Sequence, residues 1–211
     1  MYNGNKIRLF PYLKDKNKLC NLKIDDESID YITSRDDANI MTNMIKQHLA
    51  SYDLDVSKMS ITDSTAGVGG NTLSFGQHFM HVNAIEINEQ RCKYMQNNIS
   101  VYDLDNITIY NDDCTKRLKT MKQDIIFIDP PWGGKMYKFK EKIRINIGNK
   151  SIEQLCNELI HADVEHKPKL IVLKLPTNYD WVHFEKIIKK KVYMHDLKKI
   201  ILLIIDNFDN K

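Results

Sequence analysis

Between residues 60 and 205, short apolar runs alternate with segments whose apolar residues recur at helical spacing. Such alternation predicts strands joined by helices, and therefore a parallel sheet covered by helices on both faces. The expected strands are 60–63, 82–87, 107–110, 125–128, 170–175, 192–197 and 200–205. The expected helices are 36–48, 72–79, 89–101, 152–160 and 181–190.

The last two strands break this rhythm, because only Lys198 and Lys199 separate them. So short a connection predicts a hairpin, which places one antiparallel strand in an otherwise parallel sheet. We therefore expect an α/β fold with a seven-stranded, mostly parallel sheet. Residues 1–50 are expected to form a short N-terminal extension with one helix, and residues 51–211 the main domain.

Composition narrows the class of protein. A chain of 211 residues with 42% hydrophobic residues can bury a full core. A net charge of +3 argues against wholesale wrapping of nucleic acid, although local basic patches are compatible with it. The four cysteines lie far apart and the histidines are scattered, so neither disulfides nor a metal site is predicted.

No secretion signal is recognisable at the start of the sequence, and the apolar run at 200–205 is too short to span a bilayer. We therefore expect a soluble intracellular protein, in cytoplasm or nucleus, that does not bind membranes and is a monomer. A viral origin is compatible with this reading.

Residues 61–72 run from a strand through a glycine-rich loop into a helix. Glycines let backbone pass close under a ligand, and the following helix presents N–H groups that have no partner within the helix. The next strand ends in Glu86, where a carboxylate can accept hydrogen bonds from both hydroxyls of a ribose. The pattern predicts a nucleoside-containing cofactor.

Two cofactors use this arrangement. A dinucleotide needs G-x-G-x-x-G, and Gly67 and Gly69 fit, but Thr72 stands at the third glycine position. S-adenosylmethionine carries a cationic sulfonium and an ammonium group, which a carboxylate such as Asp63 would favour. At the end of the third strand, Asp113 can accept a hydrogen bond from an adenine amino group. We therefore expect S-adenosylmethionine.

The segment 128–134, Ile-Asp-Pro-Pro-Trp-Gly-Gly, follows an apolar run that is predicted to be a buried strand. The side chain of Asp129 and the backbone carbonyl of Pro130 can accept hydrogen bonds from an exocyclic base amine and so aim its lone pair. Trp132 can stack on the same base, and its electron-rich face favours a cationic ring. The segment predicts methyl transfer to a base nitrogen.

Together, the glycine loop and the D-P-P-W-G-G segment resemble the trimethylguanosine synthase family, whose members methylate the N2 of 7-methylguanosine caps on RNA. The family's G-V-G-G-N-T and P-P-W-G-G motifs are both present. Segments 8–10 and 175–178 also look like family segments. The resemblance implies a class I (Rossmann-like) methyltransferase fold and capped RNA as partner, with the N-terminal extension covering the cap site.

The resemblance also implies roles for single residues. Asp129, Pro130 and Trp132 would form the catalytic corner, although many family members have serine where this chain has Asp129. That departure leaves guanine versus adenine open. The residues implied for cofactor binding are Asp63, Thr65, Gly67, Gly69, Asn71, Thr72, Glu86 and Asp113. The residues implied for substrate binding, besides Trp132, are Lys6, Arg8, Phe10, Lys135 and Asn178.

Two alternatives stay open. One is a guanine-N2 or adenine-N6 methyltransferase acting on ribosomal RNA or DNA, which would need a long basic face or a base-flipping scaffold. The other is a catalytically inactive cap-binding module, which predicts loss of the cofactor residues. Asp63, Gly67, Glu86 and Asp113 are all present, which favours an active enzyme.

Overall fold

The computed structural model describes residues 8–163 and 165–208. The chain forms two compact units, the first ending at Asp113 and the second beginning at Cys114. Each unit has its own sheet strands and helices, and each is described separately below.

Three parallel strands form the sheet of the first unit: β1 (Ser60–Asp63), β2 (His81–Glu86) and β3 (Ile107–Asn111). The strands β1 and β2 are almost wholly buried, and their buried polar residues Thr62 and Asn83 share a hydrogen bond of 3.3 Å. Each of these two strands ends in an acid, so that Asp63 and Glu86 lie at the carboxyl edge of the same sheet.

Two helices connect these strands. α4 (Gly70–Gly76) packs on β1 and β2, and α5 (Glu89–Val101) packs on β2 and β3. α5 begins where expected because the side chain of Asn88 accepts from the first backbone N–H groups of the helix. α4 begins and ends earlier than the expected 72–79, since Gly69, with φ of +101°, already turns the chain into the helix.

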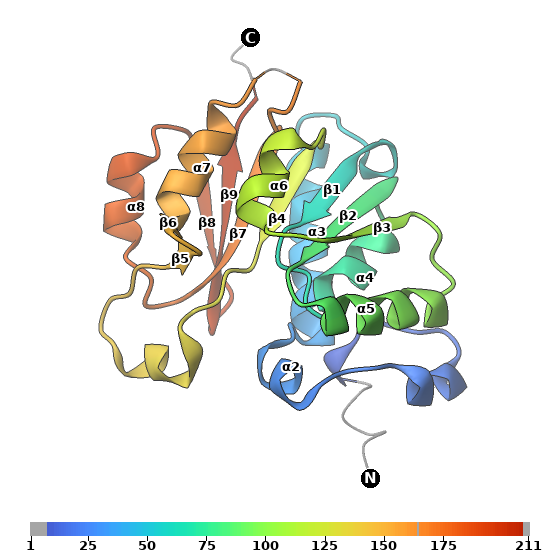
Figure 1. The fold of residues 1–211 in the computed structure, drawn as a ribbon. Coiled ribbons are helices and arrows are strands. Elements are labelled where there is room, and N and C mark those ends of the chain that lie inside the picture. Colours follow the sequence, from blue (N-terminus) through green and yellow to red (C-terminus); the bar gives the residue numbers. More distant parts are fainter. Residues whose placement is uncertain (1–7, 164, 209–211) are drawn as a thin grey trace. The chain divides into compact units, whose positions relative to one another are not determined.

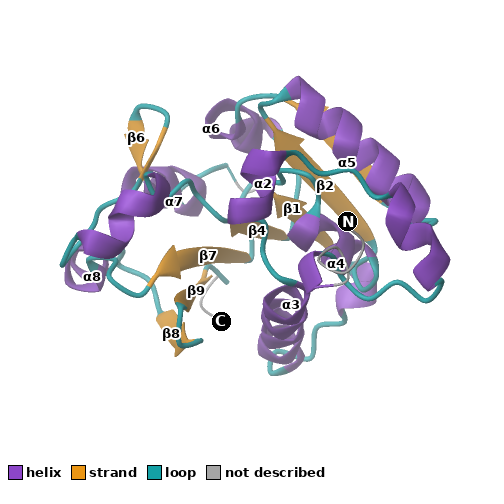
Figure 2. Ribbon diagram, turned by 90° about the horizontal axis from the view of Figure 1, so that it is seen from below, coloured by secondary structure: helices purple, strands orange, loops and turns teal. Residues whose placement is uncertain are grey.

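The N-terminal part of the first unit contains more structure than the single helix that the sequence predicted. A 3₁₀ helix, η1 (Lys16–Asn21), and a short helix, α2 (Asp26–Tyr31), precede α3 (Arg35–Ala50), and η2 (Val56–Lys58) follows it. α3 lies beside α4 (Figure 2), where Thr42 and Ser74 share a buried hydrogen bond of 2.7 Å.

The second unit contains a mixed sheet. β4 (Ile125–Ile128) runs parallel to β7 (Leu170–Pro176), while β9 (Ile200–Asp206) is antiparallel to both β7 and β8 (Val192–Asp196). The expected C-terminal hairpin is therefore confirmed, and Lys198, with φ of +72°, lies in its turn. α7 (Ile152–Ile160) and α8 (Trp181–Ile187) lie on one side of these strands (Figures 1 and 2).

Shorter elements complete the second unit. α6 (Cys114–Arg117) and η3 (Leu118–Thr120) lead into β4, and α8 ends before the expected residue 190. The segment after the D-P-P-W-G-G motif forms a 3₁₀ helix, η4 (Gly134–Phe139), and a small hairpin, β5 (Asn146–Ile147) with β6 (Lys150–Ser151). Ser151 and Gln154 form a capping box that starts α7.

The strand order is β3-β2-β1 in the first unit and β4-β7-β9-β8 in the second, with parallel pairing in both units and antiparallel pairing in these sheets only at β9. The predicted α/β fold with a mostly parallel sheet is thus confirmed. Across residues 8–163 and 165–208, none of the helices is both long and apolar enough to cross a membrane.

Candidate active site

In the first unit, Glu86 anchors the glycine loop. Its Oε2 accepts from the backbone N–H of Gly67 at 2.8 Å, and its Oε1 accepts from that of Asn88 at 2.8 Å. The carboxylate is buried and held by both bonds, and each oxygen keeps a further acceptor direction. Gly67, with φ of +55°, faces open space, since a Cβ built there would meet no atom within 4 Å. The arrangement suits a ribose whose hydroxyls donate to Glu86.

Asp63 closes β1 with a carboxylate that is only 1% exposed. Thr72, on α4, donates a hydrogen bond of 2.6 Å from its Oγ1 to Asp63 Oδ2. A buried carboxylate at this place offers negative charge to a cationic ligand. Thr72 is itself fully buried, so the structure makes it a positioning partner of Asp63.

Two buried polar atoms near the loop lack hydrogen-bond partners within the described part of the chain: Ser64 Oγ and Asn71 Oδ1. A buried polar atom without a partner is costly, and such atoms often face a ligand or water. Their presence beside Asp63 fits a polar cofactor at this edge. Ser64 was not among the expected site residues, and its only sequence signal is a hydroxyl directly after the strand's acid.

Asn98, on α5, fixes the course of the glycine loop. Its Nδ2 donates to the carbonyls of Val68 and Lys23, at 2.9 and 2.8 Å, and its Oδ1 accepts from the N–H of Lys23 at 2.7 Å. The side chain is fully buried. Asn98 therefore ties the N-terminal segment and the glycine loop to one helix. Its sequence signal is a lone amide among the inward-facing apolar positions of that helix, which includes Ile99.

The start of α4 is tightly packed against the segment before α3. A Cβ on Gly70 would come within 2.8 Å of Ile32 Cγ1, and Asn71 Nδ2 donates to Thr33 Oγ1 at 3.0 Å. Glycine is thus required at residue 70 by the close approach of Ile32. Asn71 points its amide nitrogen away from the loop, so any contact with a ligand would use its Oδ1.

The remaining expected cofactor residues lie at the same edge. Thr65 is half-buried in the loop after β1, and Gly69 supplies the turn into α4. Asp113 is half-buried just after β3, and its backbone N–H donates to Asp112 Oδ1 at 2.8 Å. The structure therefore gathers the expected cofactor residues at the ends of the adjacent strands β1, β2 and β3.

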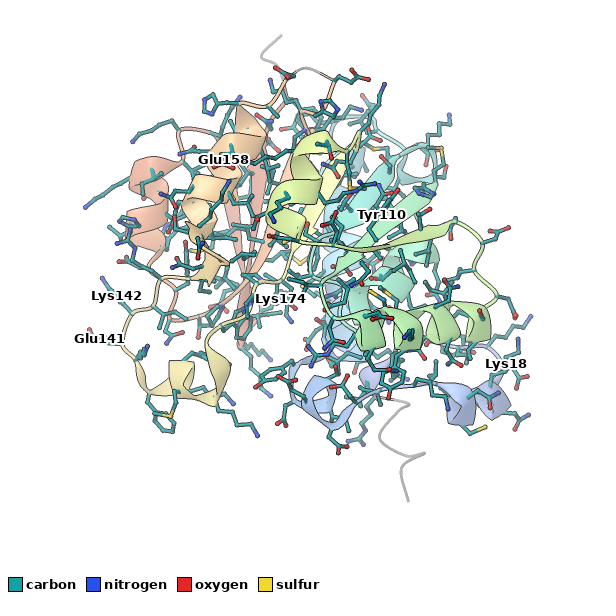
Figure 3. All side chains as sticks on the ribbon, in the orientation of Figure 1. Lys18, Tyr110, Glu141, Lys142, Glu158 and Lys174 are labelled. Carbon is teal, nitrogen blue, oxygen red and sulfur yellow. The ribbon has the colours of Figure 1, made fainter. Side chains whose placement is uncertain are left out.

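In the second unit, the strand register brings a charged partner to Asp129. Ile128 of β4 pairs with Leu173 of β7, so Asp129 and Lys174 follow side by side. Lys174 Nζ bonds Asp129 Oδ2 at 2.6 Å, with side-chain exposures of 8% and 17%. Lys174 lies near the carboxyl end of β7 (Figure 3). The sequence analysis did not name it; its signal is one lysine within an otherwise apolar strand.

Trp132 lies against both this ion pair and η4. The edge of Tyr137 meets its ring at 84°, with 5.1 Å between centroids, and Lys174 Nζ lies 5.4 Å from its ring centroid. The indole is half-buried, and its Nε1 is a buried donor with no acceptor among the residues described. Pro130 is buried. A base stacked here would lie beside a carboxylate and an indole N–H.

The basic segment 135–144 follows directly. Gly133 and Gly134 adopt φ of +86° and +72°, and the chain then enters η4. Asn178 Nδ2 donates to the carbonyls of Tyr137 and Lys140, at 2.8 and 2.7 Å, so it fixes the segment's course. Lys135 and most other basic side chains of the segment are exposed, and Phe139 is 81% exposed. Glu141 and Lys142 lie on its outer part (Figure 3).

The expected substrate residues near the N-terminus have mixed outcomes. Phe10 is fully buried in the core of the first unit, where its cluster includes Leu19, Leu22 and Leu73. A role in stacking on a cap would require it to leave that core, and the role remains a prediction. Arg8 is exposed, and Lys6 lies outside the described residues.

A buried tyrosine–glutamate pair supports the strand end that follows the active-site corner. Tyr179 donates from its hydroxyl to Glu153 Oε1 at 2.6 Å. Burial, with the hydrogen bond and charge of Glu153, raises the pKa of Tyr179 far above its ordinary value. Burial likewise raises the pKa of the nearby Cys156 thiol. Both groups are therefore neutral structural partners at physiological pH.

Comparison with known proteins identifies relatives. A protein-family model described as RNA cap guanine-N2 methyltransferase matches residues 58–209. An uncharacterised protein, L320, of Acanthamoeba polyphaga mimivirus is 36% identical, with 95% of this chain and 84% of that protein covered. The trimethylguanosine synthase of Schizosaccharomyces pombe is 28% identical, with 57% of this chain and 51% of the yeast protein covered.

Solved structures share the fold. The 16S rRNA N2 G1207 methyltransferase of Thermus thermophilus, solved in complex with S-adenosylmethionine and guanosine, superposes with a TM-score of 0.60 at 14% identity. The alignment covers 87% of this chain and 43% of that one. The chain therefore spans about half the length of the yeast relative, and less than half of this structural neighbour.

Proposed function

This chain belongs to the RNA cap guanine-N2 methyltransferase family, and we propose that it methylates the exocyclic N2 of 7-methylguanosine at the 5′ end of RNA. The observation that carries the proposal is the corner after β4. There a carboxylate and a buried proline precede a half-buried indole whose N–H lacks an acceptor within the described residues. A purine amine can donate to the carboxylate, and a purine ring can stack on the indole.

S-adenosylmethionine is the cofactor, and the first unit carries the residues that suit it. Asp63 would lie near its cationic groups, Gly67 would let it approach the backbone, and Glu86 would accept from its ribose hydroxyls. Asp113 would accept from the adenine amine. When bound, this cofactor supplies an electrophilic methyl group on a positively charged sulfur.

The chain's own contribution to the reaction is alignment. Methyl transfer to an amine is an in-line displacement, so holding the amine in the correct direction lowers the barrier. We propose that Asp129 and the carbonyl of Pro130 accept hydrogen bonds from the amine, which aims its lone pair. Trp132 would hold the base plane by stacking. No strong general base is needed before the transfer, because the amine nitrogen is itself the nucleophile; the proton that the methylated amine then sheds can pass to Asp129 or to water.

The partner that we propose is capped RNA, gripped by the segment 135–144. Exposed lysines there, with Lys135 nearest to the motif, suit the phosphates of the cap. Phe139, with 81% of its surface exposed, offers a stacking face for a following nucleotide. Asn178 would act indirectly, since its side chain holds the backbone of this segment.

Methylation assays on nucleotides test the proposal. With labelled S-adenosylmethionine, 7-methyl-GTP should be methylated far better than GTP, and equal use of both would exclude a cap-selective enzyme. Trp132→Ala should lose turnover and keep S-adenosylmethionine binding, because Trp132 belongs to the second unit and the proposed cofactor residues all belong to the first. Trp181→Phe is the control, because Trp181 is a tryptophan of the same unit that packs on Phe184, with 5.9 Å between ring centroids, and has no proposed contact with the base.

One observation favours a second candidate, a guanine-N2 or adenine-N6 methyltransferase acting on ribosomal RNA. Lys174 Nζ lies 5.4 Å from the Trp132 ring centroid, and if its partner Asp129 does not offset that charge, the cation suits a neutral base better than a cationic one. Preference for GTP, or for an adenine nucleotide, in the same assay would select this candidate.

A further inference from the structure

Lys174 Nζ lies 5.4 Å from the centroid of the proposed base-stacking ring of Trp132, and the reaction proposed above gives Lys174 no role. We propose that Lys174 is a positioning residue that sets how strongly the site prefers a cationic base over a neutral one. It would act by neutralising Asp129. The inference rests on the proposed function, since it concerns the base that Trp132 stacks on.

The register of β4 and β7 places Asp129 and Lys174 side by side. β4 and β7 are parallel, with Ile125 opposite Leu170 and Ile128 opposite Leu173. One residue beyond this last β4–β7 pair, Asp129 meets Lys174. Lysine side chains are rarely buried without an anionic partner, and Lys174 is only 6% exposed, so it needs such a partner. The apolar strand therefore carries a lysine because the neighbouring strand ends in an acid.

The opposite end of the same two strands offers a comparison. There Asp124 and Lys169 also form an ion pair, one residue before Ile125 and Leu170. Their side chains are more exposed, at 26% and 45%, against 17% for Asp129 and 8% for Lys174. A solvated pair contributes little to the local potential because water screens it. The less exposed pair at the active-site end keeps more of its electrostatic influence.

The charge of the pair decides what Trp132 attracts. An indole face draws cations, and 7-methylguanine is a cationic ring. Lys174 Nζ lies 5.4 Å from that ring centroid and, if not neutralised, would oppose a second cation. Asp129 bonds the same Nζ at 2.6 Å, so that the pair carries no net charge.

A set of four proteins tests this role: the wild type, Lys174→Met, Asp129→Ser and the double variant. Calorimetry measures the dissociation constants of 7-methyl-GTP and GTP, which differ in one methyl group and one positive charge. The selectivity ratio is the affinity for 7-methyl-GTP divided by that for GTP. Replacing a residue that merely supports the fold would weaken the binding of both nucleotides by the same factor and leave this ratio unchanged.

We expect opposite changes in the single variants. Lys174→Met removes the cation and should raise the selectivity ratio by a factor of about 2 to 10, while Asp129→Ser removes the anion and should lower it similarly. The double variant should return close to the wild-type ratio. Lys169→Met and Asp124→Ser, at the exposed pair, should leave the ratio unchanged. If Lys174→Met does not fold, Asp129→Ser and the double variant still provide the comparison.

Changes in the same direction, or unchanged ratios in all variants, would overturn the role of Lys174 while leaving the proposed function intact. If the wild type binds neither nucleotide, even with S-adenosylhomocysteine present, both the proposed function and the role of Lys174 are excluded. If the wild type methylates 7-methyl-GTP but the variants have the same selectivity ratio as the wild type, only the role of Lys174 is excluded.

Discussion

Replacing Asn98 by alanine should destabilise the first unit and loosen its glycine loop. The buried amide makes three hydrogen bonds of 2.7–2.9 Å, two with the backbone of Lys23 and one with the carbonyl of Val68. Alanine removes all three and leaves backbone groups of residues 23 and 68 without these partners. Water cannot readily replace them, because Asn98 is fully buried.

The expected loss follows from these bonds. A net contribution of about 1 kcal/mol for each hydrogen bond gives a loss of roughly 3 kcal/mol in the free energy of unfolding. For a chain of 211 residues, that loss corresponds to a fall in Tm of about 6–12 °C. Binding of S-adenosylmethionine should weaken as well, because Val68 lies between the two glycines of the loop.

Urea unfolding followed by circular dichroism measures the stability, and calorimetry measures cofactor binding. Asn97→Ala is the matched control: the half-buried side chain of Asn97 donates to the carbonyl of Asn21 at 2.8 Å and, at 3.3 Å, to Asn98 Oδ1. The control should lose less than about 1 kcal/mol. If Asn98→Ala were no less stable than Asn97→Ala, the reasoning about this buried amide would be refuted.

Three further predictions concern binding and acid stability. Glu86→Gln should weaken S-adenosylmethionine binding about 10-fold or more in calorimetry, since an amide replaces one of two acceptor oxygens; unchanged affinity would exclude the ribose contact. Burial acts to raise the pKa of Asp25, but hydrogen bonds from Ser28 and Arg91 outweigh it and lower the pKa below 3.8. This stabilisation is present above the unfolded-state pKa and lost as the pH falls through the lower folded value, so Asp25→Asn should flatten the loss of stability as the pH falls below about 5; an unaltered acid-unfolding curve would contradict this. Phe139→Ala should raise KM for capped oligonucleotides and leave KM for 7-methyl-GTP unchanged, which steady-state assays on both substrates would show; equal effects would place Phe139 at the cap itself.

The elements with strong local signals were predicted closely. The strands 60–63 and 125–128 and the helices 89–101 and 152–160 have the expected bounds. The strand 125–128 is a continuous apolar run, as is typical of a buried parallel strand, and both helices start at side-chain caps. The acids at the strand ends followed from the same patterns, since the carboxyl ends of parallel strands share one edge. For this reason, the fold class could be predicted from the sequence.

The features that depend on long-range partners were not predictable. Lys174 bonds an acid 45 residues earlier, and Asn98 bonds the backbone of Lys23, 75 residues earlier. Neither pairing has a local pattern. Phe10 shows the reverse difficulty: an aromatic residue in a three-residue match fits a stacking role and a core role equally well, and only the fold showed its burial.

Mass spectrometry of the product formed from 7-methyl-GTP and S-adenosylmethionine tests the central claim most directly. The account predicts methylation at N2 of the 7-methylguanine, with little product from GTP and with turnover lost in Trp132→Ala. Methylation of GTP at the same rate, or of an adenine nucleotide instead, would contradict the assignment of a cap guanine-N2 methyltransferase.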